Sequence, residues 1–412
     1  MPTNGPVGER IAIYRRRRGL SQAVLAGLIG RSVSWLSQVE RGTRAVDRMS
    51  VLIDLSRVLK VDIAELTGQP FALAPNGGLE PEGLADIRRV LMRYTELPAA
   101  INPGPGTVTT ASDLPQLRAR VDTAWRLRQA SRYAQLGHQV PDLITQAEQA
   151  TQHYRGDDQR AAFALLAETY QVTRAMLRKL GDAHLAWIAA DRAARAGRHA
   201  ESPLLIAVGA RALAQVFTET GQLDAALDIS LSSAAALEPS LRGDRSGPQG
   251  WSVWGALLLT AALAAARDND IGAASDYLRR ASRAADHLQV DRNDLWTSFG
   301  PTNVAIHGIS VAVELGDVTE TIRRAEQVNT TPLPADLLER RAQVFIDLGR
   351  AYVQRRDDAA ATTVFRQAEE LAPEEVHYSV PVREALREML KREHRYATPE
   401  LRPLARRTGI IS

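Results

Sequence analysis

The spacing of apolar and polar positions predicts a series of short helices at the start of the chain. Apolar side chains recur three or four residues apart, which places them on one face of a helix, and glycines or small polar residues interrupt the pattern. Serine before a helix and glycine after it are typical caps. We predict helices over residues 7–18, 22–29, 32–41, 49–59 and 62–66. Residues 1–68 are therefore expected to form a compact all-α domain.

Two stretches rich in proline and glycine follow this domain. Residues 69–83 contain both residue types at a density that helices do not tolerate, so we interpret them as a linker. The pattern then predicts a helix over 84–97 and a second break over 98–115, so that 84–115 is a linker helix followed by a Pro/Gly loop. The second large unit is predicted to span 116–412 and to be almost entirely helical.

A recurring turn divides this second unit. Segments around Gly181, Gly221, Asn269, Gly316 and Arg356 align with one another at separations of 40, 48, 47 and 40 residues. In most of them a small residue stands five positions after the turn residue, where two helices of a pair would touch. A repeat of this length is typical of stacked helical pairs.

The last repeat resembles the tetratricopeptide pattern. It carries the signature positions from Phe345 through Gly349, Ala361 and Phe365 to Pro373. The resemblance implies an α-helical repeat superhelix of long, degenerate units. The alternative is an irregular helical bundle with one accidental match. The predicted fold is thus all-α, with a five-helix N-terminal domain followed by a tetratricopeptide-like superhelix.

Composition and charge limit the classes of function that the chain can have. Of the whole chain, 45% is hydrophobic and only 5% aromatic, which favours packed helices over sheets. Residues 1–68 hold eleven Lys or Arg and six Asp or Glu, whereas the rest of the chain is nearly neutral. A basic domain on a neutral body is typical of nucleic-acid-binding proteins. The absence of cysteine excludes disulfides and thiolate chemistry, and no stretch has the length of a membrane span, so we expect a cytoplasmic protein with no membrane partner.

The segment from Gly19 to Gly42, GLSQAVLAGLIGRSVSWLSQVERG, resembles the helix-turn-helix of the phage-repressor-like XRE family of transcriptional regulators. The resemblance covers residues 7–68 and implies double-stranded DNA as the partner, with the third helix reading the major groove. It places base contacts at Val33, Ser34 and Gln38 and phosphate contacts at Gln22, Arg41, Thr43 and Arg44. Less certain DNA contacts are Trp35, Ser37 and Arg31.

Two residues of this segment need separate interpretation. By resemblance Arg15 pairs with Glu40 and holds the first helix against the third. Trp35 departs from the family, which more often has a small polar residue there, and its indole either stacks on the DNA backbone or packs against the second helix.

Catalytic and metal sites are not predicted. The eight histidines show no metal-ligand spacing, and none of the three lysines follows a glycine, so a phosphate-binding loop of the GK type is excluded. We therefore expect no enzyme activity, no cofactor and no metal.

An XRE-like domain joined to a tetratricopeptide-like body implies a regulator that forms a homodimer and binds a peptide or small-molecule effector in the concave groove. Groove positions counted in the repeat register include Gln171, and they give effector-contact candidates at Arg211, Gln215, Asn303, Ser310 and Arg350. The alternative for these polar residues is a solvated inner face. The alternative for the whole chain is a protein-interaction scaffold whose N-terminal domain binds DNA weakly or without specificity.

Overall fold

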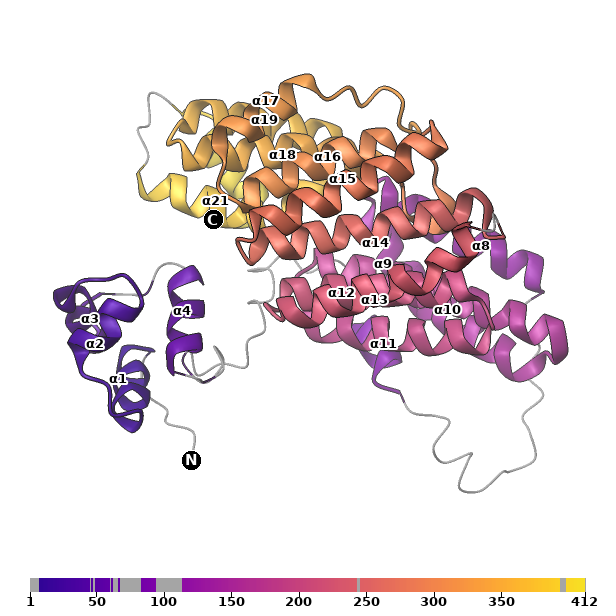
Figure 1. The fold of residues 1–412 in the computed structure, drawn as a ribbon, viewed down its shortest axis with the longest axis horizontal. Helices are drawn as coiled ribbons and strands as arrows, with labels where there is room; N and C mark the ends of the chain where they lie inside the picture. Colours follow the sequence, from indigo (N-terminus) through magenta and orange to yellow (C-terminus); the bar gives the residue numbers. More distant parts are fainter. Residues whose placement is uncertain are drawn as a thin grey trace. The chain divides into compact units, whose positions relative to one another are not determined.

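A computed structural model describes residues 7–44, 46, 49–59, 61, 66, 83–93, 113–242, 245–392 and 398–411, except for the side chains of residues 17, 49, 50, 53 and 57. The chain divides into two compact units, Met1–Ala74 and Pro75–Ser412, which we call the head and the body. Every regular element among the described residues is helical, so the predicted all-α class is confirmed (Figure 1).

Four helices of the head lie close to their predicted positions. They are α1 (Val7–Arg17), α2 (Gln22–Leu28), α3 (Val33–Glu40) and α4 (Met49–Leu59). The predicted helix over 62–66 lies outside the described residues except for Leu66, which is helical and fully buried. Apolar side chains from all four helices, Ile11, Leu25, Leu36 and Leu55 among them, form one core.

Six helical hairpins follow one another through the body. The pairs are α8 (Leu114–Gln129) with α9 (Tyr133–His153), α10 (Gly156–Lys179) with α11 (Ala183–His199), α12 (Pro203–Glu219) with α13 (Leu223–Arg242), α14 (Gly247–Arg267) with α15 (Ile271–Leu288), α16 (Pro301–Glu314) with α17 (Val318–Gln327), and α18 (Leu338–Gln354) with α19 (Asp358–Leu371). Three shorter helices close the chain: α20 (Pro373–His377), α21 (Val380–Lys391) and α22 (Leu401–Arg407). The colours of Figure 1 run through the body in this order.

The recurring turn of the sequence is the bend inside the second to sixth hairpins. Gly181, Gly221, Asn269, Gly316 and Arg356 all have a positive φ, between 62° and 79°, so the chain leaves the first helix in the same left-handed conformation each time. The residues five positions later, Ala186, Ala226, Ala274, Thr321 and Ala361, are all fully buried. The repeat interpretation, rather than an irregular bundle, is therefore confirmed.

Close approach of the paired helices explains one glycine of the tetratricopeptide signature. A Cβ atom on Gly349 of α18 would lie 2.4 Å from the ring of Phe365 on α19, and Phe365 is fully buried. A side chain at position 349 would force the two helices apart.

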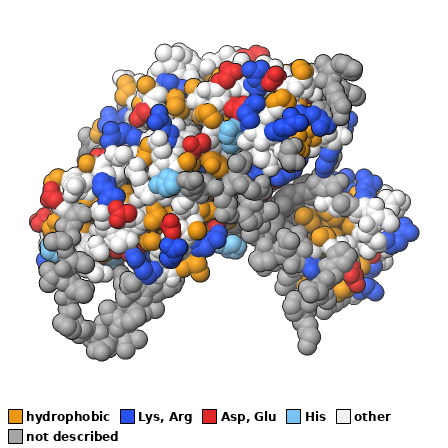
Figure 2. All heavy atoms as spheres, turned by 180° about the vertical axis from the view of Figure 1, so that it is seen from behind, with side chains coloured by type: hydrophobic (Ala, Val, Ile, Leu, Met, Phe, Trp, Pro, Cys, Tyr) orange, Lys and Arg blue, Asp and Glu red, His pale blue; other side chains and the backbone are white. Residues whose placement is uncertain are grey.

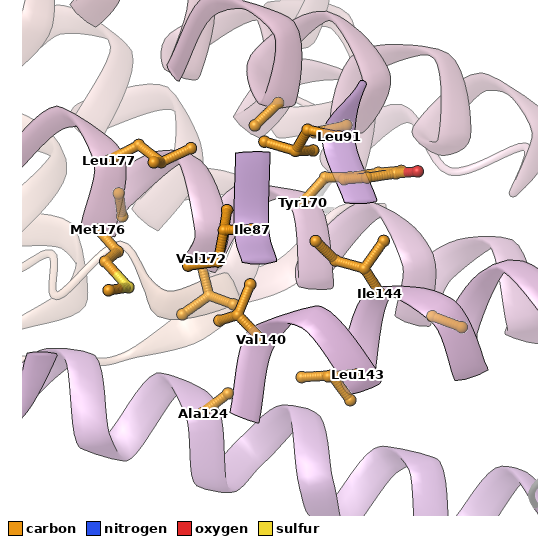
Figure 3. Close-up of a cluster of buried hydrophobic side chains, with 14 of the residues drawn as sticks. Ile87, Leu91, Ala124, Val140, Leu143, Ile144, Tyr170, Val172, Met176 and Leu177 are labelled. Atoms are coloured by element: carbon orange, nitrogen blue, oxygen red, sulfur yellow. The ribbon is translucent and has the colours of Figure 1, made fainter. Parts of the chain in front are cut away.

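The helix that the sequence places between the two units belongs to the core of the body. Helix α6 (Leu84–Leu91) packs on α9 and α11, and Leu84, Ile87 and Leu91 are buried. Figure 3 shows Ile87 and Leu91 among side chains of α8, α9 and α10. The structured part of the body thus begins before residue 116, and the loop 98–115 lies outside the described residues up to 112.

Helix α14 is long and apolar enough to pass as a membrane span by length and composition alone. In the body it is a core helix, because it packs on α12, α13, α15 and α16 and 83% of its most apolar window is buried.

The segment between α15 and α16 bridges hairpins that are far apart in the sequence. It contains the short 3-10 helix η1 (Asp294–Trp296), and the Trp296 ring stacks on Trp125 of α8 at 5.4 Å between centroids. The Trp296 indole N–H donates to Glu168 of α10 at 2.9 Å. Trp296 therefore anchors the fifth hairpin to the first two.

Candidate nucleic-acid interface and the inner face of the body

Local capping fixes the two helices that the sequence assigns to DNA recognition. The Ser21 hydroxyl accepts the Val24 N–H at the start of α2, and the Ser32 hydroxyl accepts the Trp35 N–H at the start of α3, both at 3.1 Å. Between the helices Gly30 has a φ of 61°, a left-handed conformation that favours glycine. This turn sets the angle at which α3 crosses α2.

One side of α3 is buried and the other is open. Leu36 and Val39 lie in the core, whereas Val33 is 46% exposed, Ser34 is exposed and Gln38 is half-buried. We call Val33, Ser34, Ser37 and Gln38 the outer face of α3. The side chains of Ser34 and Gln38 make no hydrogen bond within the described residues, so their polar groups are available to an external partner.

Exposed basic and polar residues follow α3 directly. The Arg41 guanidinium donates to the Ser37 carbonyl at 3.2 Å, and the Thr43 hydroxyl donates to the Gln38 carbonyl at 3.0 Å. Arg44 is exposed. These three residues therefore flank the C-terminal end of the outer face, where the phosphate contacts are expected.

Arg15, Glu40 and Gln22 join the first three helices. Arg15 donates twice to the Glu40 carboxylate, at 2.5 and 2.8 Å, and Gln22 donates to the same carboxylate at 2.7 Å. Burial alone would raise the pKa of Glu40, but the hydrogen bonds from Arg15 and Gln22 outweigh it and hold the pKa below its usual value. A phosphate contact from Gln22 can use the second N–H of the same amide or the backbone N–H at the start of α2.

Trp35 packs against the head itself. Its side chain is half-buried on the hydrophobic core, and the Arg31 guanidinium lies 5.7 Å from the ring centroid. The structure thus favours packing against the protein over stacking on the DNA backbone. Arg31 lies beside the outer face but is half-buried.

Residues 6–67 match the family model described as a helix-turn-helix domain. The head is a helix-turn-helix domain. The matched range contains all the head residues described above, from α1 to the residues after α4, and it does not include the body. No curated protein matches the chain.

One solved structure is similar to the chain over most of its length. It is the crystal structure of Bacillus thuringiensis PlcR in complex with the peptide PapR7 and DNA, with 13% identity and a TM-score of 0.32. The likeness covers 89% of this chain and 93% of that one. At this identity and TM-score it supports no conclusion about what the present chain binds.

The first helices of the hairpins line the inner face of the body. Helices α8, α10, α12, α14, α16 and α18 each contact the next one in this row, and α18 also contacts α8. Arg128 of α8 pairs with Glu339 of α18, and each side chain is only 6% exposed. The sixth hairpin therefore returns to the first.

Three of the five predicted effector residues are engaged by neighbours on this inner face. Gln215 accepts a hydrogen bond from Arg174 at 2.7 Å, and Ser310 donates to Asp347 at 2.5 Å. Arg350 pairs with Glu314 at 2.9 Å and with Asp347 at 3.4 Å. All of these contacts except the Arg350–Asp347 pair, which lies within α18, join adjacent hairpins and so stabilise the stack.

The other two predicted effector residues are buried without complete partners. Arg211 is 7% exposed, its Nε has no hydrogen-bond partner, and it makes no ion pair with a described residue. Asn303 is 1% exposed, and its Oδ1 has no partner in the part of the chain that the structure describes. In the same part of the chain, neither amide atom of Gln171, another groove position, is paired. Unsatisfied polar groups at this depth are rare in folded proteins.

Sequence reasoning missed most of the charge around Arg211. Basic side chains from four inner helices gather here, and we call them the cationic cluster: Arg128, Arg174, Arg178, Lys179, Arg211 and Arg340. Acidic partners on the described residues are Glu219 for Arg178, Glu339 for Arg128 and Arg340, and Glu375 for Lys179. The cluster thus has six positive groups and three negative ones.

Burial and the excess positive charge both lower the pKa values of buried basic groups here. Desolvation, together with the charges of Arg340, Arg178 and Arg128, lowers the pKa of Arg211 to about 9. His307 of α16 is affected in the same way: desolvation and the neighbouring arginines lower its pKa to about 3, so its imidazole is neutral at physiological pH. The interior around Arg211 is therefore strongly positive.

The sequence could have predicted that Arg174 and Arg178 face the groove, because they stand three and seven residues after the predicted groove position Gln171 and so share its helix face. No sequence pattern predicts Arg128 and Arg340 as members of the cluster, since they reach it only when the sixth hairpin meets the first.

Proposed function

We propose that this chain is a sequence-specific DNA-binding transcriptional regulator. The observation that carries the proposal is the outer face of α3, which is held in a fixed orientation by Leu36 and Val39 and leaves the side chains of Ser34 and Gln38 without a hydrogen-bond partner among the described residues. A helix of this kind fits the major groove of B-DNA, where base edges offer hydrogen-bond donors and acceptors. The match of the head to a helix-turn-helix family supports the same function.

The roles of the individual residues follow from their positions. Gln38 presents an amide suited to adenine, Ser34 a hydroxyl suited to several base edges, and Val33 an apolar contact for the thymine methyl group. Gln22, Arg41, Thr43 and Arg44 hold the phosphates on either side and set the register without reading sequence.

The body completes this function in two ways. One head reads few base pairs, which is too little information to select one site in a genome, so two heads on a two-fold axis are required. The body is the larger surface and is the proposed source of the homodimer. Its inner face is the proposed effector site, with Arg211 and Asn303 as the contacts, because a ligand that favours one curvature of the hairpin stack changes the separation of the two heads.

Retention of genomic DNA fragments on the full-length protein tests the DNA-binding function. We expect a small set of fragments to be enriched by the wild-type protein and lost with Ser34→Ala/Gln38→Ala. The matched control is Ser232→Ala/Gln327→Ala, which changes the same residue types at exposed positions of the body. Retention without sequence enrichment would instead support an interaction scaffold with a weak DNA-binding head.

Sedimentation at micromolar concentration tests the dimer. The full chain is expected to sediment as a dimer and residues 1–74 as a monomer. A monomeric full chain that still binds an asymmetric site tightly contradicts the two-headed mechanism.

A further inference from the structure

The unpaired groups of the inner face lie at one level of the hairpin stack. Helices α10 and α12 run side by side with a constant offset, because Arg174 contacts Gln215 and Arg178 contacts Glu219, both 41 residues apart. Gln171 precedes Arg174 by one turn and Arg211 precedes Gln215 by one turn. Gln171 and Arg211 are thus neighbours across the two helices.

Helices from opposite sides of the stack face the same place. The charges of Arg340 on α18 and Arg128 on α8 act on Arg211. The charges of Arg211 and Arg340 in turn act on His307 of α16. Asn303 stands one turn before His307 on the same helix, and the His307 ring nitrogen Nδ1 lies 2.9 Å from the Asn303 carbonyl. Helices α8, α10, α16 and α18 therefore each place a basic or imidazole side chain near Arg211 of α12.

Folding alone does not account for this arrangement. A buried guanidinium is normally paired with an anion, because the desolvation of an isolated charge is strongly unfavourable. Arg211 has no such anion among the described residues, and the three acidic groups nearby are engaged by other members of the cationic cluster. The amide of Gln171 and the Oδ1 of Asn303, both on side chains buried to 99%, add a donor and acceptors that no group of the described residues satisfies.

We propose that the inner face binds a ligand carrying a carboxylate or phosphate group, held by Arg211 and Gln171, with a hydrogen-bond donor of the ligand directed at Asn303. A guanidinium and an amide N–H together match the geometry of an oxyanion, and charge-assisted bonds of this kind are among the stronger ones in proteins. The free Oδ1 of Asn303 is an acceptor, so the ligand also offers an N–H or O–H group. This inference rests on the proposed function, since it names the chemical class of the effector.

Thermal unfolding and calorimetry of the full-length protein test the site without DNA, so failure of DNA binding leaves this result unaffected. The probes are inorganic phosphate, citrate and a mixed pentapeptide library with free C-terminal carboxylates, each compared with sodium chloride at equal ionic strength. The same library with amidated C-termini separates a peptide terminus from a small anion as the source of the charge. At least one probe is expected to raise the melting temperature in a saturable manner.

Two variants with opposite expectations make the test specific. Arg211→Met removes an unpaired buried charge, so it should leave the melting temperature of the free protein unchanged or higher and weaken the affinity for the active probe by about tenfold or more. Arg350→Met is the matched control on another inner helix, α18. It leaves the buried Asp347 without its cation and Glu314 with only Arg267, so it should lower the melting temperature and retain the response to the probe.

Gln171→Leu provides a second variant that keeps the cationic cluster intact. It should fold as stably as the wild-type protein, because the amide that it removes has no partner, and it should bind the active probe more weakly. The proposal is overturned if no probe acts beyond sodium chloride, or if Arg211→Met loses stability as Arg350→Met does. Retention of the full response by both Arg211→Met and Gln171→Leu overturns it as well.

Discussion

The head and the body place their charged residues in opposite ways. In the head one ion pair, Arg15 with Glu40, is internal, and the remaining polar groups of α3 and the residues after it point outward. In the body the first helices of the hairpins turn charged and amide side chains toward one another, and the cationic cluster is largely buried. On the face of the body shown in Figure 2, acidic and basic side chains are mixed with apolar ones rather than gathered in one patch.

This difference fits the two proposed partners, which differ in size. An outward polar face on a fixed helix suits a large external surface such as a DNA groove. An inward set of unpaired polar groups suits a ligand small enough to be enclosed. The same physical rule, that buried polar groups need partners, explains both regions: the head leaves its free groups in water and the body keeps them inside.

The largest expected effect comes from breaking the contact that returns the end of the body to its beginning. Glu375 of α20 is 2% exposed, pairs with Lys179 of α10, and accepts hydrogen bonds from Tyr133 and Ser131. Glu375→Gln leaves Lys179 without its carboxylate and should destabilise the body by about 3–5 kcal/mol. Denaturant unfolding of the full chain measures this.

The control for that change is Glu370→Gln, which breaks an exposed pair with Arg366 and should cost less than about 1 kcal/mol. If both variants lowered the free energy of unfolding by the same amount, the contact between α20 and α10 would stabilise the body no more than an exposed ion pair does.

A smaller effect is expected from the ion pair of the head. The side chains of Arg15 and Glu40 are 13% and 6% exposed, so the pair lies between a surface pair and a fully buried one. Arg15→Ala should therefore lower the free energy of unfolding by about 2 kcal/mol. The measurement is unfolding of residues 1–74, in which Trp35 is the one tryptophan and reports the transition by fluorescence. An unchanged midpoint would mean that Glu40 does not hold α1 against α3.

The same pair gives the head a pH dependence. The pKa of Glu40 is lowered in the folded state, so the unfolded chain binds its proton at a higher pH than the folded chain does. The stability contributed by Glu40 is thus fully present above the ordinary pKa of 4.5 and is lost as the pH falls through the lower folded value. The stability difference between the wild-type protein and Glu40→Gln should begin to shrink about one pH unit above that pKa and should be lost once the pH is below the lower folded pKa. A difference that is constant with pH contradicts this role.

The smallest expected effect is that of a single phosphate contact. Arg44→Ala should weaken binding to all DNA sequences alike and reduce the slope of log affinity against log salt by about 0.9. The control is Arg355→Ala, an exposed arginine of the body paired with Asp357, which should leave the slope unchanged. A change in sequence preference with Arg44→Ala would place this residue on a base.

Much of the fold could be predicted because it depends on local patterns. Helix positions in the head follow from apolar spacing and from caps such as Ser21 and Gly30, which act within a few residues. The turns at Gly181 and Gly316 could be aligned for the same reason, since each hairpin repeats one backbone conformation.

The contents of the inner face could be predicted only in part. Arg211 and Asn303 follow from the repeat register, whereas their environment depends on the meeting of hairpins that are up to two hundred residues apart. Neither the pairing of Arg128 with Glu339 nor the bridge made by Trp296 has a local signal. The sequence therefore predicts which residues face inward but not which of them find partners.

The central claim is that the outer face of α3 reads DNA sequence. The most direct test is the base preference of the full-length protein at a retained fragment, measured position by position for the wild-type protein and for Gln38→Ala. The account predicts that discrimination is lost by about 1–3 kcal/mol at one base pair of each half-site and is kept at the others. An identical preference profile for the two proteins would contradict the claim.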